Sequence, residues 1–107
     1  MSVNVSHVNR IGYCTLKQGE NKFKIWFCHM NGLCAMMYFY NEVEDEKKIP
    51  MMQLHAFFSD LTHAKRCINN DFFKGYSNFH FYAKELNNDL WRMIKVMTEK
   101  NIKVTIE

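Results

Sequence analysis

The clearest hydrophobic pattern in the chain is a pair of apolar runs, residues 22–30 and 33–41, separated by Asn31-Gly32. Asparagine and glycine both tolerate positive φ, which a two-residue type I′ turn requires, so the pattern predicts a β-hairpin. A two-residue turn also fixes the register. We therefore expect Met30 opposite Leu33 and Trp26 opposite Met37.

Shorter alternating patterns predict three more strands. Residues 11–16 alternate, and a turn at residues 18–21 joins them to the hairpin, which favours an antiparallel meander of three strands. Residues 79–84 and 102–106 also alternate, and each is typical of a strand.

Helical spacing follows the hairpin. Pro50 suits the first turn of a helix, and the apolar positions Leu54, Leu61 and Ile68 predict that it runs from residue 50 to residue 69. A second helix is expected after a cap at Asn87 or Asn88, ending at residue 101. The predicted fold is α+β, with a mixed or mostly antiparallel five-stranded sheet in the order β-β-β-α-β-α-β and two helices packed on one face.

Length and composition indicate one domain. The chain has 107 residues, of which 48% are hydrophobic, enough for a single core. We expect a frayed segment at residues 1–9 and an acidic loop at residues 41–49. With neither a signal-peptide pattern nor an apolar run long enough for a membrane span, a cytoplasmic protein without membrane contact is expected.

Charge is distributed unevenly. The net charge is +3, yet four acids fall within five residues of the acidic loop: Glu42, Glu44, Asp45 and Glu46. The rest of the chain is correspondingly more basic. Such a chain can attract phosphate-rich partners and also present acids to a basic groove.

Both faces of the predicted hairpin are apolar, although two helices on one side of the sheet can cover only one of them. An exposed aromatic face usually marks an interaction surface. We expect the uncovered face to carry Lys24, Trp26, Met37 and Phe39. Two alternatives stay open: the N-terminal segment or the acidic loop folds over this face, or two copies form a homodimer through it.

Residues that could carry catalysis or bind zinc do not form convincing sites. Ser59, Asp60 and His63 share one turn of the predicted helix and cannot converge on one substrate atom. His63 and Cys67 are four residues apart but lie away from the apolar stripe. The four cysteines, which we expect to be reduced thiols, show no CxxC spacing: Cys14, Cys28, Cys34 and Cys67. No catalytic residue, metal or cofactor is expected.

Residues 74–81 (KGYSNFHF) echo the RNP1 octapeptide of RNA-recognition motifs, because they open on Lys-Gly-Tyr and end on an aromatic residue. They depart from it at Asn78 and Phe79. The predicted order also lacks the strand that the motif places between its first helix and the RNP1 strand, because residues 69–77 are expected to form a loop. RNA contact stays open, and its candidate residues are bases and aromatics of this strand and the two helices: Lys65, Arg66, His80, Tyr82, Lys84, Arg92 and Lys95.

The combination of small size, α+β build, an uncovered aromatic face and an acidic loop resembles the inhibitors that phages and mobile elements use against host defence, anti-CRISPR proteins in particular. The resemblance is one of general type and involves no shared motif. It implies a non-enzymatic inhibitor in the host cytoplasm that binds a protein or ribonucleoprotein effector, such as a CRISPR-Cas nuclease complex, and blocks its RNA or DNA binding. A stand-alone RNA-binding domain is the alternative, and a thiol- or metal-dependent enzyme is the third candidate.

Overall fold

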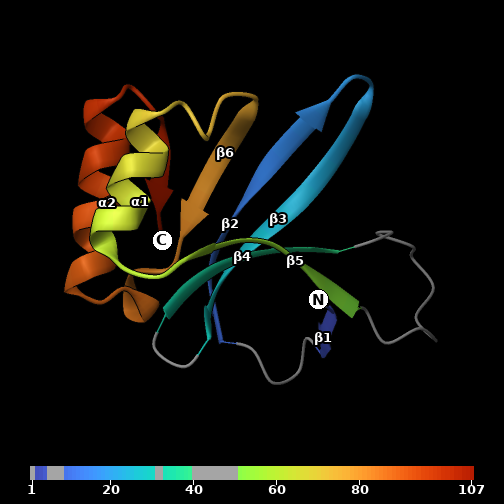
Figure 1. Cartoon of the computed structure of the whole chain (residues 1–107), viewed down its shortest axis with the longest axis horizontal. Helices are drawn as coiled ribbons and strands as arrows, with labels where there is room; N and C mark the ends of the chain where they lie inside the picture. Colours follow the sequence, from blue (N-terminus) through green and yellow to red (C-terminus); the bar gives the residue numbers. More distant parts are fainter. Residues whose placement is uncertain (1, 5–8, 31–32, 40–50) are drawn as a thin grey trace.

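The computed structural model describes residues 2–4, 9–30, 33–39 and 51–107. Its strands and helices follow one another as β1 (Ser2–Asn4), β2 (Asn9–Gln18), β3 (Asn21–Met30), β4 (Leu33–Phe39), β5 (Met51–Phe58), α1 (Leu61–Asn69), β6 (Tyr76–Phe81), the short 3-10 helix η2 (Ala83–Glu85), α2 (Asn88–Glu99) and β7 (Val104–Ile106). The described strands form one sheet in the order β1-β5-β4-β3-β2-β6-β7, and both α-helices lie side by side at one side of it (Figure 1).

The predicted α+β fold with a mixed sheet and two helices is confirmed. β3 and β4 form the hairpin in the expected register, with Met30 opposite Leu33 and Trp26 opposite Met37. β2 pairs with β3 on one side and with β6 on the other, antiparallel in both cases. β7 runs parallel to β6, because α2 carries the chain back between the two strands.

The predicted helix from residue 50 to residue 69 is wrong in its first half. Met51–Phe58 is strand β5, which pairs antiparallel with β4, and only Leu61–Asn69 is helical. The expected frayed start is also wrong for Ser2–Asn4, which pairs with β5 as strand β1. The described sheet therefore has seven strands where five were expected. Segment 51–58 forms hydrogen bonds along the edge of β4. This stabilisation comes from a long-range pairing, which the spacing of apolar residues within the segment cannot indicate.

Side-chain caps set where both helices begin. Asp60 precedes α1 in an extended conformation, and its Oδ1 accepts a hydrogen bond of 2.8 Å from the backbone N–H of His63. Asn87, one of the two caps that the sequence predicts, caps α2 in the same way through a 2.8 Å bond from the N–H of Leu90. Each cap satisfies one of the N–H groups that a helix start leaves unbonded.

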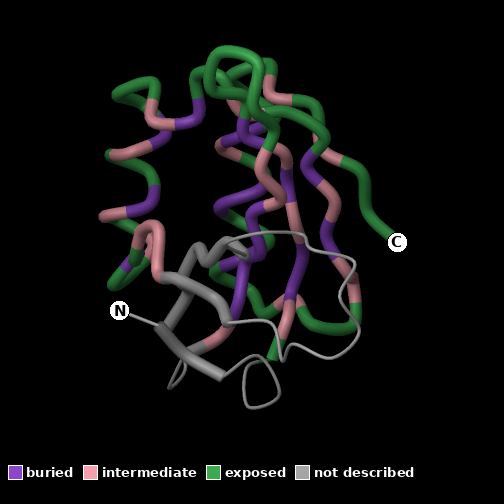
Figure 2. The backbone as a smooth tube through the Cα atoms, turned by 90° about the vertical axis from the view of Figure 1, so that its right-hand side faces the viewer, coloured by how far each residue is buried: buried purple, intermediate pink, exposed green. Residues whose placement is uncertain are grey.

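The core lies between the helices and one face of the sheet. Phe27, Phe79 and Phe81 point from the central strands into it, and Met93 and Met97 of α2 meet them, all with at most 2% of their surface exposed. Buried residues consequently line the inner side of the helices and of the strands (Figure 2). Burying each of these rings contributes about 1.5–3 kcal/mol of stability.

The turn between α1 and β6 contributes to the core instead of lying on the surface. Phe73 is 5% exposed, and its ring centroid lies 6.2 Å from that of Phe27 and 5.1 Å from that of Phe79. His55 of β5 hydrogen-bonds through Nε2 to the hydroxyl of Tyr76 of β6. These two strands are separated by β4, β3 and β2 in the sheet order, so the sheet curves around this aromatic turn.

No helix among the described residues combines the length and apolar character needed to cross a bilayer.

Candidate nucleic-acid interface

Three aromatic side chains stand next to one another on the face of the sheet that the helices leave uncovered. Tyr13 of β2 is paired with Trp26 of β3 and with His80 of β6, and cross-strand partners project to the same side. The rings of Tyr13 and His80 are stacked, with centroids 4.9 Å apart and planes 15° from parallel. Trp26 meets Tyr13 edge-on at 5.3 Å. This aromatic group extends across three strands.

Two cations lie over these rings. The Nζ of Lys24 is 4.5 Å from the centroid of Tyr13 and 4.6 Å from that of Trp26. The guanidinium carbon of Arg10 is 4.3 Å from the centroid of Trp26. Each contact is stabilising by about 0.5–2 kcal/mol, depending on how far the cation is desolvated. Lys24 and Arg10 are held in place while part of each remains at the surface.

The far end of the β2–β3 hairpin adds two more bases. Lys17 and Lys22 face each other in the strand pairing and are exposed. Because Leu16 and Phe23 of the preceding pair pack with the core, alternation places the two lysines on the outer face. Like charges directly opposite in a strand pair are destabilising. An anion bound between them would remove that cost.

The other end of the aromatic group contains Tyr82 and Glu107. Tyr82 lies 5.6 Å from His80 by ring centroids, and Nε2 of His80 is 2.8 Å from Oε2 of Glu107. Burial raises the pKa of Tyr82, and neighbouring Tyr13 and Glu107 raise it further, while Arg10 opposes them. The Tyr82 hydroxyl therefore stays protonated and available as a hydrogen-bond donor at neutral pH.

We call the set Arg10, Tyr13, Lys17, Lys22, Lys24, Trp26, His80 and Tyr82 the outer sheet face. It unites two groups that the sequence analysis kept apart, the expected protein-binding pair Lys24 and Trp26 and the expected RNA-contacting pair His80 and Tyr82. Arg10, Tyr13, Lys17 and Lys22 were missed as site residues. The alternation from Tyr13 to Lys17 places these two residues on one side of a strand, but it does not indicate that β6 lies beside that strand.

The expected exposure of Trp26 is wrong. Trp26 does lie on the side away from the helices, yet only 7% of its surface is exposed. Arg10 and Tyr13, both from β2, lie against its ring. Its neighbour Cys28 on the same face is completely buried, and burial raises the pKa of its thiol to about 12. Trp26 therefore supports its neighbours on the outer sheet face more than it offers a contact surface to a partner.

The other predicted partner-binding residues belong to β4 and to the expected acidic loop. Met37 is placed opposite Trp26 and Phe39 is at the end of β4, both by backbone pairing alone. Glu42, Glu44, Asp45 and Glu46 lie outside the described residues, as does the whole expected acidic loop.

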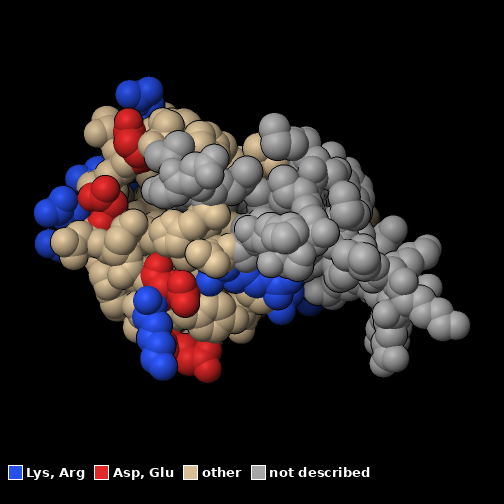
Figure 3. Space-filling view, turned by 90° about the horizontal axis from the view of Figure 1, so that it is seen from below, with Lys and Arg blue, Asp and Glu red and all other residues tan. Residues whose placement is uncertain are grey.

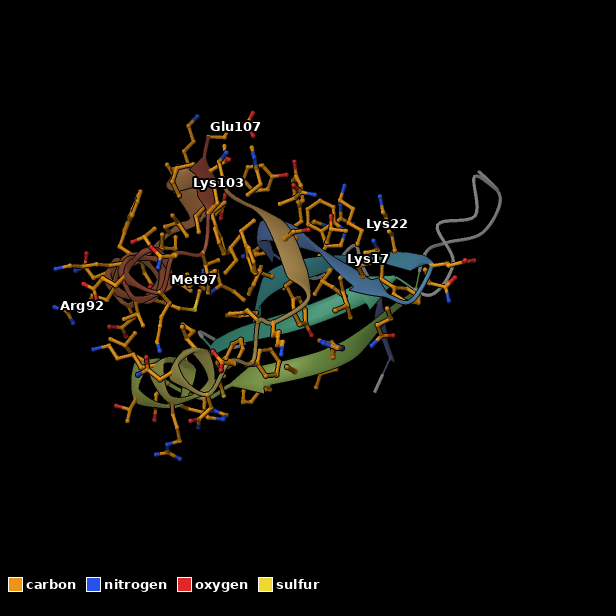
Figure 4. All side chains as sticks on the ribbon, turned by 90° about the horizontal axis from the view of Figure 1, so that it is seen from above. Lys17, Lys22, Arg92, Met97, Lys103 and Glu107 are labelled. Atoms are coloured by element: carbon orange, nitrogen blue, oxygen red, sulfur yellow. The ribbon has the colours of Figure 1, made fainter. Side chains whose placement is uncertain are left out.

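The basic residues predicted on the helices belong to another surface. Lys65 and Arg66 of α1 and Arg92 and Lys95 of α2 are all exposed. Seen from below, basic and acidic groups alternate along the helix side (Figure 3), and Arg92 itself lies 3.6 Å from Asp89. Figure 4 shows Arg92 and the pair Lys17 and Lys22 at opposite ends of the molecule. Lys84, in η2, is also exposed.

The Ser59, Asp60 and His63 group does not assemble as a catalytic triad. Asp60 bonds the backbone of His63 and not its ring. The ring's Nδ1 lies 3.4 Å from the Ser59 hydroxyl and 3.3 Å from the Ser59 backbone nitrogen, which donates to it. Within the described residues, no three His, Cys, Asp or Glu side chains come together as metal ligands would. Burial also raises the pKa of Cys14 to about 12.

No protein-family model matches this chain, and neither the curated proteins nor the solved structures contain a match to it.

Proposed function

We propose that this chain is a non-enzymatic binding protein that holds a single-stranded nucleic acid on its outer sheet face. The observation that carries the proposal is the stacked pair of Tyr13 and His80 with the Lys24 ammonium above the Tyr13 ring. Single strands are commonly bound by aromatic side chains on which bases stack, next to cations that follow the phosphates.

The chemistry of each group suits this role. Half-buried Tyr13 and His80 offer ring surface on paired strands, and half-buried Tyr82 does so directly after the end of β6. A base that stacks on Tyr13 would take the place of Lys24, whose ammonium is then free to contact the adjoining phosphate. Lys17 and Lys22 continue the basic surface along the hairpin. A stacked base contributes about 1–3 kcal/mol of binding free energy.

The inhibitor function expected from the sequence stays a prediction. Its contact set depends on an exposed Trp26, which is buried, and on the acidic residues 42–46, which lie outside the described residues. Direct binding of a nucleic-acid strand depends only on residues that lie together on the outer sheet face. The outer sheet face therefore favours nucleic acid over a protein partner.

The test compares two triple variants with the same change in charge on opposite sides of the molecule. Lys17→Gln, Lys22→Gln and Lys24→Gln remove three charges from the outer sheet face, whereas Lys65→Gln, Arg66→Gln and Lys95→Gln remove three from the helices. Binding of a fluorescent oligouridylate is measured by anisotropy at several salt concentrations. Each lost phosphate contact should reduce the salt slope by about 0.7.

We expect the first triple variant to lose affinity and salt dependence, and the second to bind nearly as the native chain does. A duplex of equal length should bind more weakly, because its bases cannot stack on the face. Equal losses in both triple variants would place the site elsewhere. A native chain that ignores the oligonucleotide at low salt would refute the function altogether.

A further inference from the structure

A cavity of about 300 Å³ opens where the two helices begin, apart from the outer sheet face. Its described lining comes from the end of β3, the end of β5 and the first turns of both helices: His29, Phe58, Ser59, Asp60, Leu61, Ala64, Asn87, Asp89, Leu90 and Met93. Both helices begin at their lower ends as drawn in Figure 1, so the two helix starts lie at the same end of the helix pair. The volume is at the lower limit of ordinary small-molecule sites.

The floor of the cavity is apolar. Phe58, Ala64, Leu90 and Met93 are each at most 4% exposed, and Leu61 is half-buried beside them. A ligand that reaches this floor must carry a hydrocarbon or aromatic part, because the floor has no side-chain polar atom to bond it. The selectivity for charge must come from the rim.

The rim is polar and carries negative charge. Asp60 and Asp89 are exposed carboxylates at the starts of α1 and α2, and no lysine or arginine is among the described lining residues. His29 also lines the cavity, and its Nε2 donates a hydrogen bond of 3.2 Å to the backbone oxygen of Glu85.

The sum of these charges selects the sign of the ligand. Each helix start contributes about +0.5 charge, and the two carboxylates contribute −2, so the rim retains about one negative charge. Arg92 lies 3.6 Å from Asp89, but both side chains are about two-thirds exposed. Such a pair interacts weakly in water and leaves the carboxylate able to bind another cation.

We propose that this cavity binds a small organic ammonium ion, with its apolar body on the Phe58 and Met93 floor and its amine between Asp60 and Asp89. The cavity would reject carboxylates and phosphates, which the two aspartates repel. This site does not depend on nucleic-acid binding and is tested without any oligonucleotide.

The test is an amide NMR titration of the full chain with three probes of nearly equal shape: phenethylamine, 2-phenylethanol and phenylacetate. Phenethylamine should shift the Leu61 and Leu90 signals saturably, and should bind about tenfold more tightly than the alcohol. Phenylacetate should bind more weakly still. Equal binding of amine and alcohol, tighter binding of phenylacetate, or no saturable shift with phenethylamine would each overturn the proposal.

Variants test the placement. Asp60→Asn preserves the helix cap, and both it and Asp89→Asn should weaken phenethylamine binding about fivefold. Asp71→Asn removes an exposed acid outside the cavity lining and should change nothing. An Asp71→Asn loss equal to the other two would contradict the site. A lysine-containing tripeptide that binds more tightly than phenethylamine would assign the cavity to a partner's side chain and overturn the small-molecule ligand.

Discussion

The central strands β2, β3 and β6 carry different side chains on their two faces. Phe27 of β3 and Phe79 and Phe81 of β6 lie on the helix side, whereas Tyr13 of β2, Trp26 of β3 and His80 of β6 lie on the outer side. The phenylalanines are at most 2% exposed and are enclosed by side chains of α1, α2 and the aromatic turn. The outer rings carry polar atoms, and Lys24 and Arg10 lie over two of them. The helix side of the sheet is therefore covered by the chain itself. The outer side keeps charged groups and ring surface next to solvent.

The difference separates stability from binding. A purely apolar ring stabilises the fold by leaving water, and it stabilises it most when it is completely enclosed. A half-buried ring next to a cation contributes less to folding but can exchange its cation for a base. Substitutions on the helix side should therefore change the free energy of unfolding, and those on the outer side should change affinity.

The largest effect should come from Phe27→Ala. The ring is completely buried against Phe73, Phe79 and Phe81, and its loss should lower the free energy of unfolding by about 3–5 kcal/mol. Urea denaturation measures the change. Phe57→Ala is the control. Because Phe57 is 38% exposed, its replacement should lower the free energy of unfolding far less. Similar losses in the two variants would contradict the placement of the core.

Gly12→Ala should disturb both faces, because Gly12 lies where β2 meets β6. An added Cβ would lie 2.4 Å from the backbone oxygen of His80 and 3.0 Å from the Cα of Phe81. Backbone atoms cannot rotate away, so we expect a loss of about 1–3 kcal/mol in the free energy of unfolding. Thr15→Ala on the same strand serves as the control in the same urea experiment. If Gly12→Ala had the same urea midpoint as the native chain, β2 and β6 could not be packed this closely.

Tyr13→Leu on the outer side should lower affinity for nucleic acid instead of stability. It preserves an apolar side chain but removes the stacking partner of His80, so we expect affinity for the oligouridylate to fall about tenfold. Tyr13→Phe retains the ring and should bind nearly as the native chain. Anisotropy gives the affinities, and urea denaturation verifies that both variants are folded. Equal affinity of the two variants would mean that the ring does not contact bases.

The smallest effect concerns pH. Burial lowers the pKa of His55 in the folded chain below its usual value, which is about 6.5 in an unfolded chain. Below that pH the unfolded chain binds more protons, so stability should fall as pH decreases from about 6.5 toward the lowered pKa. His55→Gln can still hydrogen-bond the Tyr76 hydroxyl and should flatten this part of the curve. Parallel curves for the native chain and the variant, from urea denaturation at several pH values, would contradict the assignment.

Local signals in the sequence predicted much of the fold. Asn31-Gly32 was enough to predict the β3–β4 register, and Asn87 was one of the two residues predicted to cap α2. Residues 51–58 could not be assigned in this way, because their apolar positions fit a helix as well as a strand. The open edge of β4 decides between the two, and that edge exists only once the hairpin has formed.

The candidate site was predictable only in parts. Lys24 was chosen from the hairpin pattern and His80 from the RNP1-like octapeptide, and neither pattern indicates that β2 lies between β3 and β6. That arrangement is a long-range pairing, and it brings Tyr13 and Arg10 to the centre of the outer sheet face. The basic residues of the helices were grouped with His80 by charge alone, which carries no information about the side of the sheet.

The most direct test of the central claim is to map an oligouridylate onto the ¹⁵N-labelled chain by NMR. We expect saturable shifts of the amide signals of Tyr13, Lys24 and His80, with those of Lys65 and Arg92 unchanged. Shifts confined to the helices, or none at a concentration that binds the outer sheet face in anisotropy, would contradict it.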